Sequence, residues 1–273
     1  MRVALDTDRF SLIQGDSLEV LRSFADKSFD CIITDPPYHT HVHEKLGKER
    51  RNDATAPRAD LTFPPMTKRL MRSLAREYVR ICKGWIISFS DYYNSYWWGT
   101  YVQGAGGAWV RTGSWVKTSP MPQMTGDRPG TGQEDIVICH AEPKGWAWNG
   151  HGKAATWRGR RDEAWPDRDA GHPNQKPLWL LQSLLGMFCP PGALVLDPFA
   201  GSSTLAAAAL ATDRLPGESP LETACPKCAK KILELYQPPL PQGVNVVGVE
   251  GDQRWIDLSI LRIREVVPSL LVA

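Results

Sequence analysis

The tetrapeptide Asp35-Pro36-Pro37-Tyr38 carries groups that could act on the exocyclic amino group of a nucleic-acid base. The lone pair of such a nitrogen is delocalised into the ring, and two hydrogen-bond acceptors can localise it by pulling the nitrogen toward tetrahedral geometry. The Asp35 carboxylate and the Pro36 carbonyl, whose direction is pre-set by a fixed φ, are candidates for these acceptors. Tyr38 offers a ring on which an extruded base can stack. The ordinary alternative is a Pro-Pro turn that ends a strand, with Asp35 as a cap.

A second candidate site is the turn Asp197-Pro198-Phe199-Ala200-Gly201-Ser202-Ser203-Thr204, which follows an apolar run and precedes an Ala-rich segment. This pattern predicts a strand, a Gly/Ser turn and a helix N-terminus, where free N–H groups and the helix dipole favour a carboxylate-bearing ligand. The chain has no G-x-G-x-x-G and no phosphate-binding Gly-Lys-Ser/Thr, which argues against dehydrogenases and nucleoside triphosphatases. A Gly-rich turn that binds nothing remains the alternative.

The third candidate is Glu250, which follows the strand-like run 244–249. A carboxylate at the end of the next strand can accept both ribose hydroxyls of an adenosine ligand. Glu250 comes 53 positions after Asp197, whereas a simple strand–helix–strand unit would place it about 20 residues on. A Pro-rich insertion at 212–243 accounts for the excess length. A solvated carboxylate at a strand end is the alternative for Glu250.

The elements that must position these residues alternate between strand and helix patterns. Strand-like runs occur at 11–14, 29–34, 85–89, 109–117, 135–139, 193–196 and 244–249, and helical patterns at 18–24, 65–82, 178–188, 204–211 and 255–266. The apolar runs 29–34 and 85–89 are typical of strands buried on both faces. This alternation predicts a single α/β domain over residues 1–273 with a mostly parallel sheet.

The formal net charge is only +2, so any nucleic-acid surface must be a local patch. The polar segment 39–62 predicts a DNA-facing loop, and the Trp/Arg-rich segment 143–171 predicts a target-recognition region. The cations nominated for DNA contact are Lys45, Lys48, Arg50 and Arg51 in the first segment, and Arg158, Arg160 and Arg161 in the second. Arg69, Arg72, Arg76 and Arg80 share one face of the 65–82 helix. A solvated face is the ordinary interpretation of that row, and DNA contact is the alternative.

Composition narrows the class of protein. The 273 residues contain no signal-type segment and no apolar run long enough to span a bilayer, which predicts a cytoplasmic protein without a membrane partner. Six cysteines suggest reduced thiols and no disulfide framework. Cys225 and Cys228 supply only two of the four ligands of a structural zinc site, so no metal is expected.

Taken together, these motifs resemble the β group of DNA amino-methyltransferases, a circularly permuted branch in which the catalytic motif precedes the cofactor motif. Asp35–Tyr38 matches the catalytic motif, and Asp197–Thr204 matches a D-P-F-x-G-S-G-T turn with Ser203 in place of the second glycine. Gly15-Asp16, the segments 115–117 and 134–137, and the H-P-x-Q-K-P element at 172–177 match further family positions in the same order.

The resemblance implies a Rossmann-like S-adenosylmethionine-dependent methyltransferase fold with a small inserted recognition region. It assigns the methionine end of S-adenosylmethionine to Asp197, Phe199 and Ser202, with Gly201 in the same turn and Lys176 nearby. It assigns the ribose to Glu250 and the adenine to Asp16. The catalytic residues that it implies are Asp35, Pro36, Pro37 and Tyr38.

The implied activity is site-specific methylation of the exocyclic amino group of a base flipped out of double-stranded DNA. Asp at the first position of the tetrapeptide favours adenine N6 over cytosine N4 within the family. The alternatives are an N4-cytosine enzyme, a methyltransferase for RNA or protein glutamine, which usually has Asn at that position, and a catalytically silent DNA-binding relative. A restriction endonuclease counterpart and a homodimer are further candidate partners.

Overall fold

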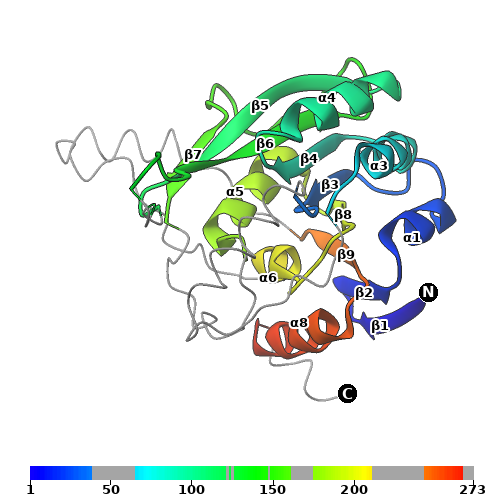
Figure 1. Ribbon diagram of the computed structural model, residues 1–273. Coiled ribbons are helices and arrows are strands. Elements are labelled where there is room, and N and C mark those ends of the chain that lie inside the picture. Colours follow the sequence, from blue (N-terminus) through cyan, green and yellow to red (C-terminus); the bar gives the residue numbers. More distant parts are fainter. Residues whose placement is uncertain are drawn as a thin grey trace.

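The computed structural model describes residues 1–38, 65–120, 123, 126–146, 148–160, 175–210 and 243–266. They form one nine-stranded sheet with helices on both faces (Figure 1). Five of the eight strand pairings in this described part are parallel, and the other three are antiparallel. The predicted α/β class with a mostly parallel sheet is therefore confirmed.

The elements follow the predicted ranges closely. The strands are β1 (Arg2–Asp6), β2 (Phe10–Gln14), β3 (Cys31–Thr34), β4 (Trp85–Ser90), β5 (Ala108–Lys117), β6 (Gln133–His140), β7 (Thr156–Gly159), β8 (Leu194–Asp197) and β9 (Asn245–Glu250). The described helices are α1 (Ser17–Ser23), α3 (Lys68–Ile81), α4 (Ser95–Gly104), α5 (Leu178–Phe188), α6 (Thr204–Leu210) and α8 (Gln253–Val266). The strand order is β1-β2-β9-β8-β3-β4-β6-β5-β7.

Two apolar cores lie on the two faces of the sheet. Helices α1, α3 and α4 contribute to one core, and α5, α6 and α8 contribute to the other (Figure 1). Every residue of β3 and β4 is buried, as expected for strands covered on both faces. Helix α5 is buried along its whole length, because it lies in the second core rather than at the surface.

The strand order places the motif-bearing strands side by side. Strands β3 and β8 pair in parallel, with Ile32 opposite Leu196, although they are far apart in the sequence. Strand β9 pairs with β8 on one side and with β2 on the other. The strands β2, β9, β8, β3 and β4 therefore all end at one side of the sheet, which we call the carboxyl edge. The predicted insertion at 212–243 lies outside the described residues apart from Gly243.

Three elements are absent from the sequence prediction. Helix α4 contains two glycines and has no clean helical period of apolar residues. Strand β1 has no fully buried residue and only extends the edge of the sheet. Strand β7 lies inside the segment 143–171, for which no core element is predicted, yet Trp157 is buried and pairs with Trp115 of β5. The sequence pattern predicts no strand at residues 156–159, and this is wrong. The short run forms a strand because it pairs with β5.

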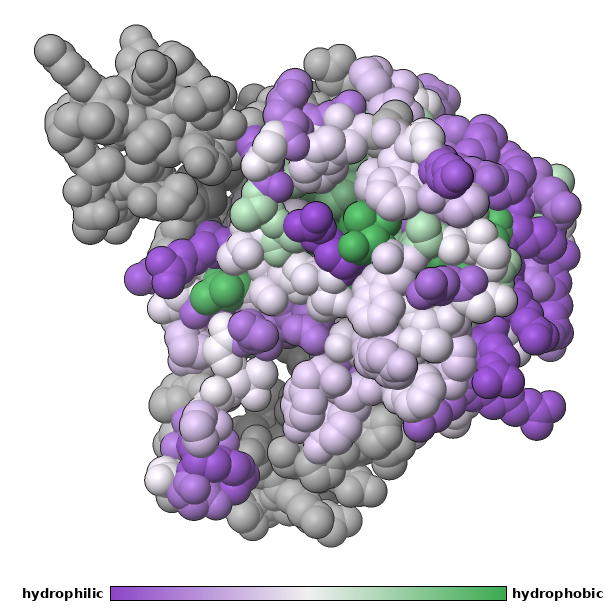
Figure 2. All heavy atoms as spheres, turned by 90° about the horizontal axis from the view of Figure 1, so that it is seen from above, coloured by the Kyte–Doolittle hydropathy of each residue, from purple (hydrophilic) through white to green (hydrophobic). Residues whose placement is uncertain are grey.

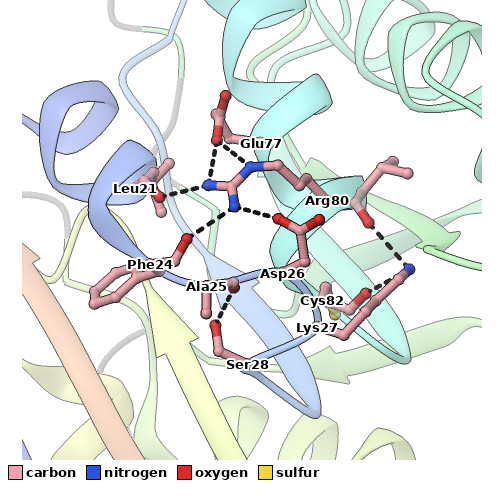
Figure 3. Close-up of polar contacts among 10 residues, drawn as sticks. Leu21, Phe24, Ala25, Asp26, Lys27, Ser28, Glu77, Arg80 and Cys82 are labelled. Carbon is pink, nitrogen blue, oxygen red and sulfur yellow. Dashed lines mark hydrogen bonds and ion pairs between the residues drawn. The ribbon is translucent and has the colours of Figure 1, made fainter.

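Helix α3 is tied to the loop after α1 by one arginine (Figure 3). The Arg80 guanidinium donates to Glu77 Oε2 at 2.7 Å, to Asp26 Oδ1 at 2.6 Å, and to the carbonyls of Leu21 and Phe24 at 3.0 and 2.8 Å. A guanidinium carries five N–H donors in one plane, and the ammonium of a lysine could not bind these four acceptors in the same arrangement. Arg80 is therefore not part of a solvated row.

The other three arginines of the predicted row keep their side chains exposed. Arg69, Arg72 and Arg76 lie on the outer face of α3, whereas Met71 and Leu74 face the core. The predicted shared face is thus correct for three arginines and wrong for Arg80, which the acidic and carbonyl groups of the preceding loop draw inward.

The described residues contain free cysteines, no metal-binding cluster and no helix that could cross a membrane. Cys31, Cys82, Cys139 and Cys189 are buried free thiols. Within the described ranges, no cluster of three side chains has the composition of a metal site. None of the helices described has the length and apolar character that crossing a bilayer requires.

We expect Arg80→Ala to lower the free energy of unfolding by about 1–3 kcal/mol, because charge-assisted bonds to partly buried carbonyls are lost. Arg76→Ala on the same helix is the matched control, with an expected change within about 0.5 kcal/mol. Urea unfolding of both variants measures the difference. Equal effects from the two substitutions would contradict a structural role for Arg80.

Candidate active site

Acidic residues predicted from the sequence meet at the carboxyl edge. Strands β2, β9, β8 and β3 are consecutive in the sheet, and their ends bring Asp16, Glu250, Asp197 and Asp35 into one row. The parallel pairing of β3 with β8 is decisive, because it sets the tetrapeptide Asp35–Tyr38 beside the Gly/Ser turn. Ligands of open α/β sheets bind at this side of the sheet.

The ammonium group of Lys176 binds side chains of the tetrapeptide Asp35–Tyr38. Its Nζ donates to Asp35 Oδ2 at 2.6 Å and to the Tyr38 hydroxyl at 3.1 Å, and it lies 3.2 Å from Glu134 Oε2. The three donors of a lysine thus find three oxygen acceptors. Only 7% of the Lys176 side chain is exposed. Burial opposes the charged form, but the Asp35 and Glu134 carboxylates raise the pKa of Lys176 above its ordinary value.

Glu134 and Lys117 complete this network, and neither was assigned a role from the sequence. Glu134 Oε2 accepts from the Tyr38 hydroxyl at 3.0 Å, and Glu134 Oε1 accepts from Lys117 Nζ at 2.6 Å. Burial opposes ionisation of Glu134, yet Lys176 and Lys117 lower its pKa to about 2. Two carboxylates and two ammonium groups therefore balance their charges beside Tyr38.

Two acceptors of the tetrapeptide remain available for a ligand. Asp35 Oδ1 is buried and has no hydrogen-bond partner in the part of the chain that the structure describes. No donor among the same residues binds the Pro36 carbonyl. Burial raises the pKa of Asp35, and the Lys176 ammonium opposes that rise. A buried acceptor without a donor is rare in native proteins, so Asp35 Oδ1 indicates a place for an N–H-bearing ligand, and the Pro36 carbonyl is a second acceptor in the next residue.

The turn after β8 holds a buried carboxyl. Asp197 Oδ1 accepts from the Phe199 N–H at 3.1 Å, and burial raises the pKa of Asp197 to about 7. Asp35 and Glu250 add to this rise because they place negative charge nearby. A cationic ligand group beside Asp197 would offset this cost of burial.

Glu250 is oriented by the backbone of the same turn. Its Oε2 accepts from the Gly201 N–H at 2.9 Å, and its Oε1 accepts from the Asp252 N–H at 2.8 Å. Each carboxylate oxygen has room for a further hydrogen bond. Glu250 can therefore accept two hydroxyl groups while it remains bound to the turn. Burial raises its pKa above the ordinary value.

Ser203 occupies a position where glycine would be unstrained. Its φ is 54°, in the left-handed region, and its hydroxyl donates to Ser259 Oγ of α8 at 2.9 Å. Ser259 in turn donates to the Gly201 carbonyl at 2.9 Å, so the extra side chain is used to fix the turn. Arg262, which is 2% exposed, donates to both the carbonyl and the hydroxyl of Ser202.

The comparison with protein families agrees with this geometry. The family model described as DNA methylase, named for N6 and N4 methyltransferases, matches residues 29–259. This chain belongs to the DNA methylase family. The matched range contains the tetrapeptide, Lys176, the turn after β8 and Glu250.

Individual relatives of this DNA methylase are distant in sequence. YubD of Escherichia coli (strain K12), which carries the name of a methylase, is 26% identical over 74% of this chain and 80% of its own length. The Type II methyltransferase M.HinfI of Haemophilus influenzae is 23% identical over 95% of this chain and 69% of its own.

Solved structures share the fold of this methylase. The M1.HpyAVI–SAM complex has a TM-score of 0.62 with 19% identity, covering 93% of this chain and 98% of that one. The cytosine-N4-specific PvuII DNA methyltransferase has a TM-score of 0.64 with 16% identity, covering 95% and 88%. The expected Rossmann-like methyltransferase fold is confirmed.

The remaining predicted site residues differ in their surroundings, and some lie outside the described part of the chain. Asp16 accepts from the Glu19 N–H at 3.0 Å as the N-cap of α1, so one of its oxygens is committed to the helix. The hydrogen bonds of Lys176 within the described ranges go to the catalytic side of the edge, although the resemblance assigns it to the cofactor. Arg158 and Arg160 are exposed at the end of β7. Lys45, Lys48, Arg50, Arg51, Arg161, Cys225 and Cys228 lie outside the described residues.

The buried Asp197 predicts how the stability of this methylase depends on pH. Its pKa is about 7 in the folded chain against an ordinary 3.8, so between these values the folded state keeps a proton that the unfolded state releases. The free energy of unfolding should therefore fall as the pH rises through this window. We expect Asp197→Asn to exceed the wild type in stability at pH 8 by a few kcal/mol, at about 1.4 kcal/mol per pKa unit.

Urea unfolding of both proteins at pH 4 and pH 8 checks this prediction. The advantage of Asp197→Asn should be small at pH 4, where the wild-type carboxyl is protonated in the folded state and still partly protonated in the unfolded state. A constant difference between the two proteins at both pH values would contradict the raised pKa of Asp197.

Proposed function

We propose that this chain is a site-specific DNA methyltransferase that transfers a methyl group from S-adenosylmethionine to N6 of an adenine flipped out of the duplex. The observation that carries the proposal is the pair of unpartnered acceptors, Asp35 Oδ1 and the Pro36 carbonyl, beside the turn that follows β8. An amino group has two hydrogens, and these two acceptors match them in number. The turn beside them supplies the second half of a two-substrate reaction.

The residues at the carboxyl edge fit S-adenosylmethionine. Glu250 keeps acceptor capacity for the two ribose hydroxyls, and the buried Asp197 carboxyl suits the cationic end of the methionine moiety. Gly201 and Ser202 belong to the turn that would hold the methionine end, and Asp16 caps the helix next to β2. When bound, S-adenosylmethionine supplies an electrophilic methyl group on its sulfonium.

The chain's own residues prepare the acceptor nitrogen. Asp35 and the Pro36 carbonyl bind the two N–H groups and localise the nitrogen lone pair toward the methyl donor. The Tyr38 hydroxyl is held by Lys176 and Glu134, which fixes the ring against which the base stacks. Holding both reactants at one edge replaces much of the entropy loss of a bimolecular encounter.

Lys176 keeps Asp35 in its carboxylate form. Burial alone favours protonation of Asp35, and a protonated carboxyl would donate rather than accept at one oxygen. The ammonium at 2.6 Å favours the charged form. After transfer, the nitrogen loses one proton, which Asp35 takes up and passes to water.

Adenine is favoured over cytosine by Asp35 at the first position of the tetrapeptide, as the family resemblance implies. Cytosine N4 is the second candidate, because the PvuII structure is that of a cytosine-N4-specific enzyme on the same fold. The name of M.HinfI as a Type II methyltransferase supports a restriction endonuclease counterpart as part of the proposal.

The proposed function is tested with purified protein and S-adenosylmethionine labelled in the methyl group. Duplex DNA, RNA and total protein are offered as acceptors, and the labelled DNA is digested to nucleosides for chromatography. We expect label in duplex DNA as N6-methyladenine. Label in N4-methylcytosine would replace the base assignment, and label only in RNA or protein would refute the proposed substrate.

Asp35→Ala should reduce methyl transfer at least a hundredfold, equivalent to about 2.7 kcal/mol in the barrier. Its affinity for S-adenosylmethionine, measured by calorimetry, should stay near that of the wild type, because Asp35 serves the base side of the edge. Asp8→Ala, which removes an exposed carboxylate from the turn between β1 and β2, is the matched control for loss of charge. Near-normal turnover by Asp35→Ala would refute the mechanism.

A further inference from the structure

A surface of tyrosines and basic residues lies beside the catalytic tetrapeptide. It consists of the exposed residues Lys68, Arg69, Arg72 and Arg76 of α3 and of Tyr92, Tyr93 and Tyr96 at the start of α4, and we call it the aromatic–basic surface. The tyrosines are 65%, 39% and 57% exposed, which is unusual for side chains of this size. From the sequence, DNA contact is only the alternative interpretation of Arg69, Arg72 and Arg76, and the tyrosines have no assigned role.

The fold presents the tyrosines at the carboxyl edge. Strand β4 pairs in parallel with β3 and therefore ends next to the tetrapeptide. The buried Asp91 then turns the chain, since its Oδ1 accepts from the Tyr93 N–H at 2.8 Å and from the Asn94 N–H at 3.0 Å. Tyr92 and Tyr93 are left outside this turn, with their ring centroids 4.2 Å apart.

The start of α3 lies at the same edge. The Met66 N–H donates to the Tyr38 carbonyl at 3.2 Å, so the residues just before α3 touch the tetrapeptide itself. Helix α3 packs on α4, and Lys68 Nζ lies 3.9 Å from the centroid of the Trp97 ring. The Arg72 guanidinium lies 5.2 Å from the centroid of the Tyr101 ring. Cations and aromatic rings are therefore continuous from α3 to α4.

These cations have no carboxylate partners in the described part of the chain. Arg80, on the same helix, is satisfied by Asp26 and Glu77, so the contrast is within one element. Lys68 and Arg69 stand in the first turn of α3, where the helix dipole disfavours positive charge and no acidic residue is present. An anionic partner would offset the unfavourable interaction of these two cations with the helix dipole.

Figure 2 views the molecule from above and colours its residues by hydropathy. Weakly polar side chains spread over the middle of this face, and strongly hydrophilic ones line its right-hand margin, the side on which α1 and α3 lie in Figure 1. The exposed cations of α3 and the exposed tyrosines before and in α4 suit a partner that offers both flat rings and negative charge.

We propose that the aromatic–basic surface binds the DNA strand that flanks the flipped base. Phosphates lie against Arg69, Arg72 and Lys68, and Tyr92 and Tyr96 contact the bases or sugars next to the target. A second copy of the chain is a poorer occupant, because a two-fold contact would set this row of cations against itself. The inference rests on the proposed function and adds the location of the DNA.

The test measures DNA affinity rather than methylation. Fluorescence anisotropy with a labelled duplex is recorded over a series of salt concentrations for wild type and for Arg69→Glu/Arg72→Glu. We expect the dissociation constant to rise at least tenfold at 0.1 M salt. The slope of log affinity against log salt should flatten by about 2, since each phosphate contact contributes about 0.9.

The matched control is Arg2→Glu/Arg264→Glu, which changes the net charge equally on β1 and α8, at the other end of the sheet order. It should change the salt slope by less than half as much. Tyr92→Ser should weaken binding at least fivefold through lost stacking. Unchanged melting temperature and cofactor affinity in each variant show that the fold is intact.

An unchanged affinity and salt slope in Arg69→Glu/Arg72→Glu would overturn the inference, as would an equal loss in the control. A change in molecular mass by light scattering with unchanged DNA affinity would assign the surface to contact between copies and overturn it as well. If the wild type methylates DNA while these variants bind DNA normally, only the proposed location of the DNA is refuted. If the wild type neither binds nor methylates DNA, the proposed function itself fails.

Discussion

The contact between the Lys176 ammonium and the carboxylates of Asp35 and Glu134 is the constraint on which the catalytic half of the site depends. Removing a lysine ammonium from water costs several kcal/mol, and only close acceptors with good geometry offset it. Two of the three oxygens come from the tetrapeptide after β3 and the third comes from strand β6, which lies far away in the sequence. Strands β3, β4 and β6 must therefore be paired before these oxygens can surround the lysine.

The cofactor half of the site depends on rigidity of a different kind. The turn after β8 contains two residues with positive φ, Gly201 and Ser203. Hydrogen bonds from α8 hold it, through Ser259 and Arg262, while Glu250 binds the Gly201 N–H from the next strand. Donors and acceptors that are already fixed need no rearrangement when a ligand arrives, which is the main source of electrostatic stabilisation in enzymes.

Much of the fold and part of the site can be predicted from the sequence, and the reasons differ between residues. Strands β3 and β4 can be predicted because both faces of each strand are buried, which produces apolar runs in the sequence. Asp35 and Asp197 follow such runs directly, so their meeting at one edge follows from parallel pairing. Motif order and the resemblance to a family supply the assignment to methyl transfer.

Other parts of the site depend on non-local register that a single sequence does not reveal. Glu134 reaches Tyr38 because β6 runs antiparallel to β4 and begins at the carboxyl edge, which spacing alone cannot show. Lys176 is directed to Asp35 rather than to the turn after β8 by contacts with two separate segments, the tetrapeptide and β6. Helix α4 has no clear period, because Tyr96 is exposed while Trp98, Tyr101 and Val102 pack inward, so aromatic residues occur on both faces.

The most direct test of this account is the pH dependence of single-turnover methyl transfer to DNA with saturating S-adenosylmethionine, in wild type and in Lys176→Met. The carboxylate of Asp35 must be ionised to accept from the base, so the rate falls as the pH drops through the pKa of Asp35. Burial raises the pKa of Asp35, and the Lys176 ammonium opposes this rise. Without the ammonium the pKa of Asp35 should rise further, and the acidic limb of the profile should move to higher pH. Lys83→Met, which removes a surface ammonium from Asp30, is the control and should leave the limb in place. An acidic limb at the same pH in wild type and Lys176→Met would contradict the claim that Lys176 keeps Asp35 ready for catalysis.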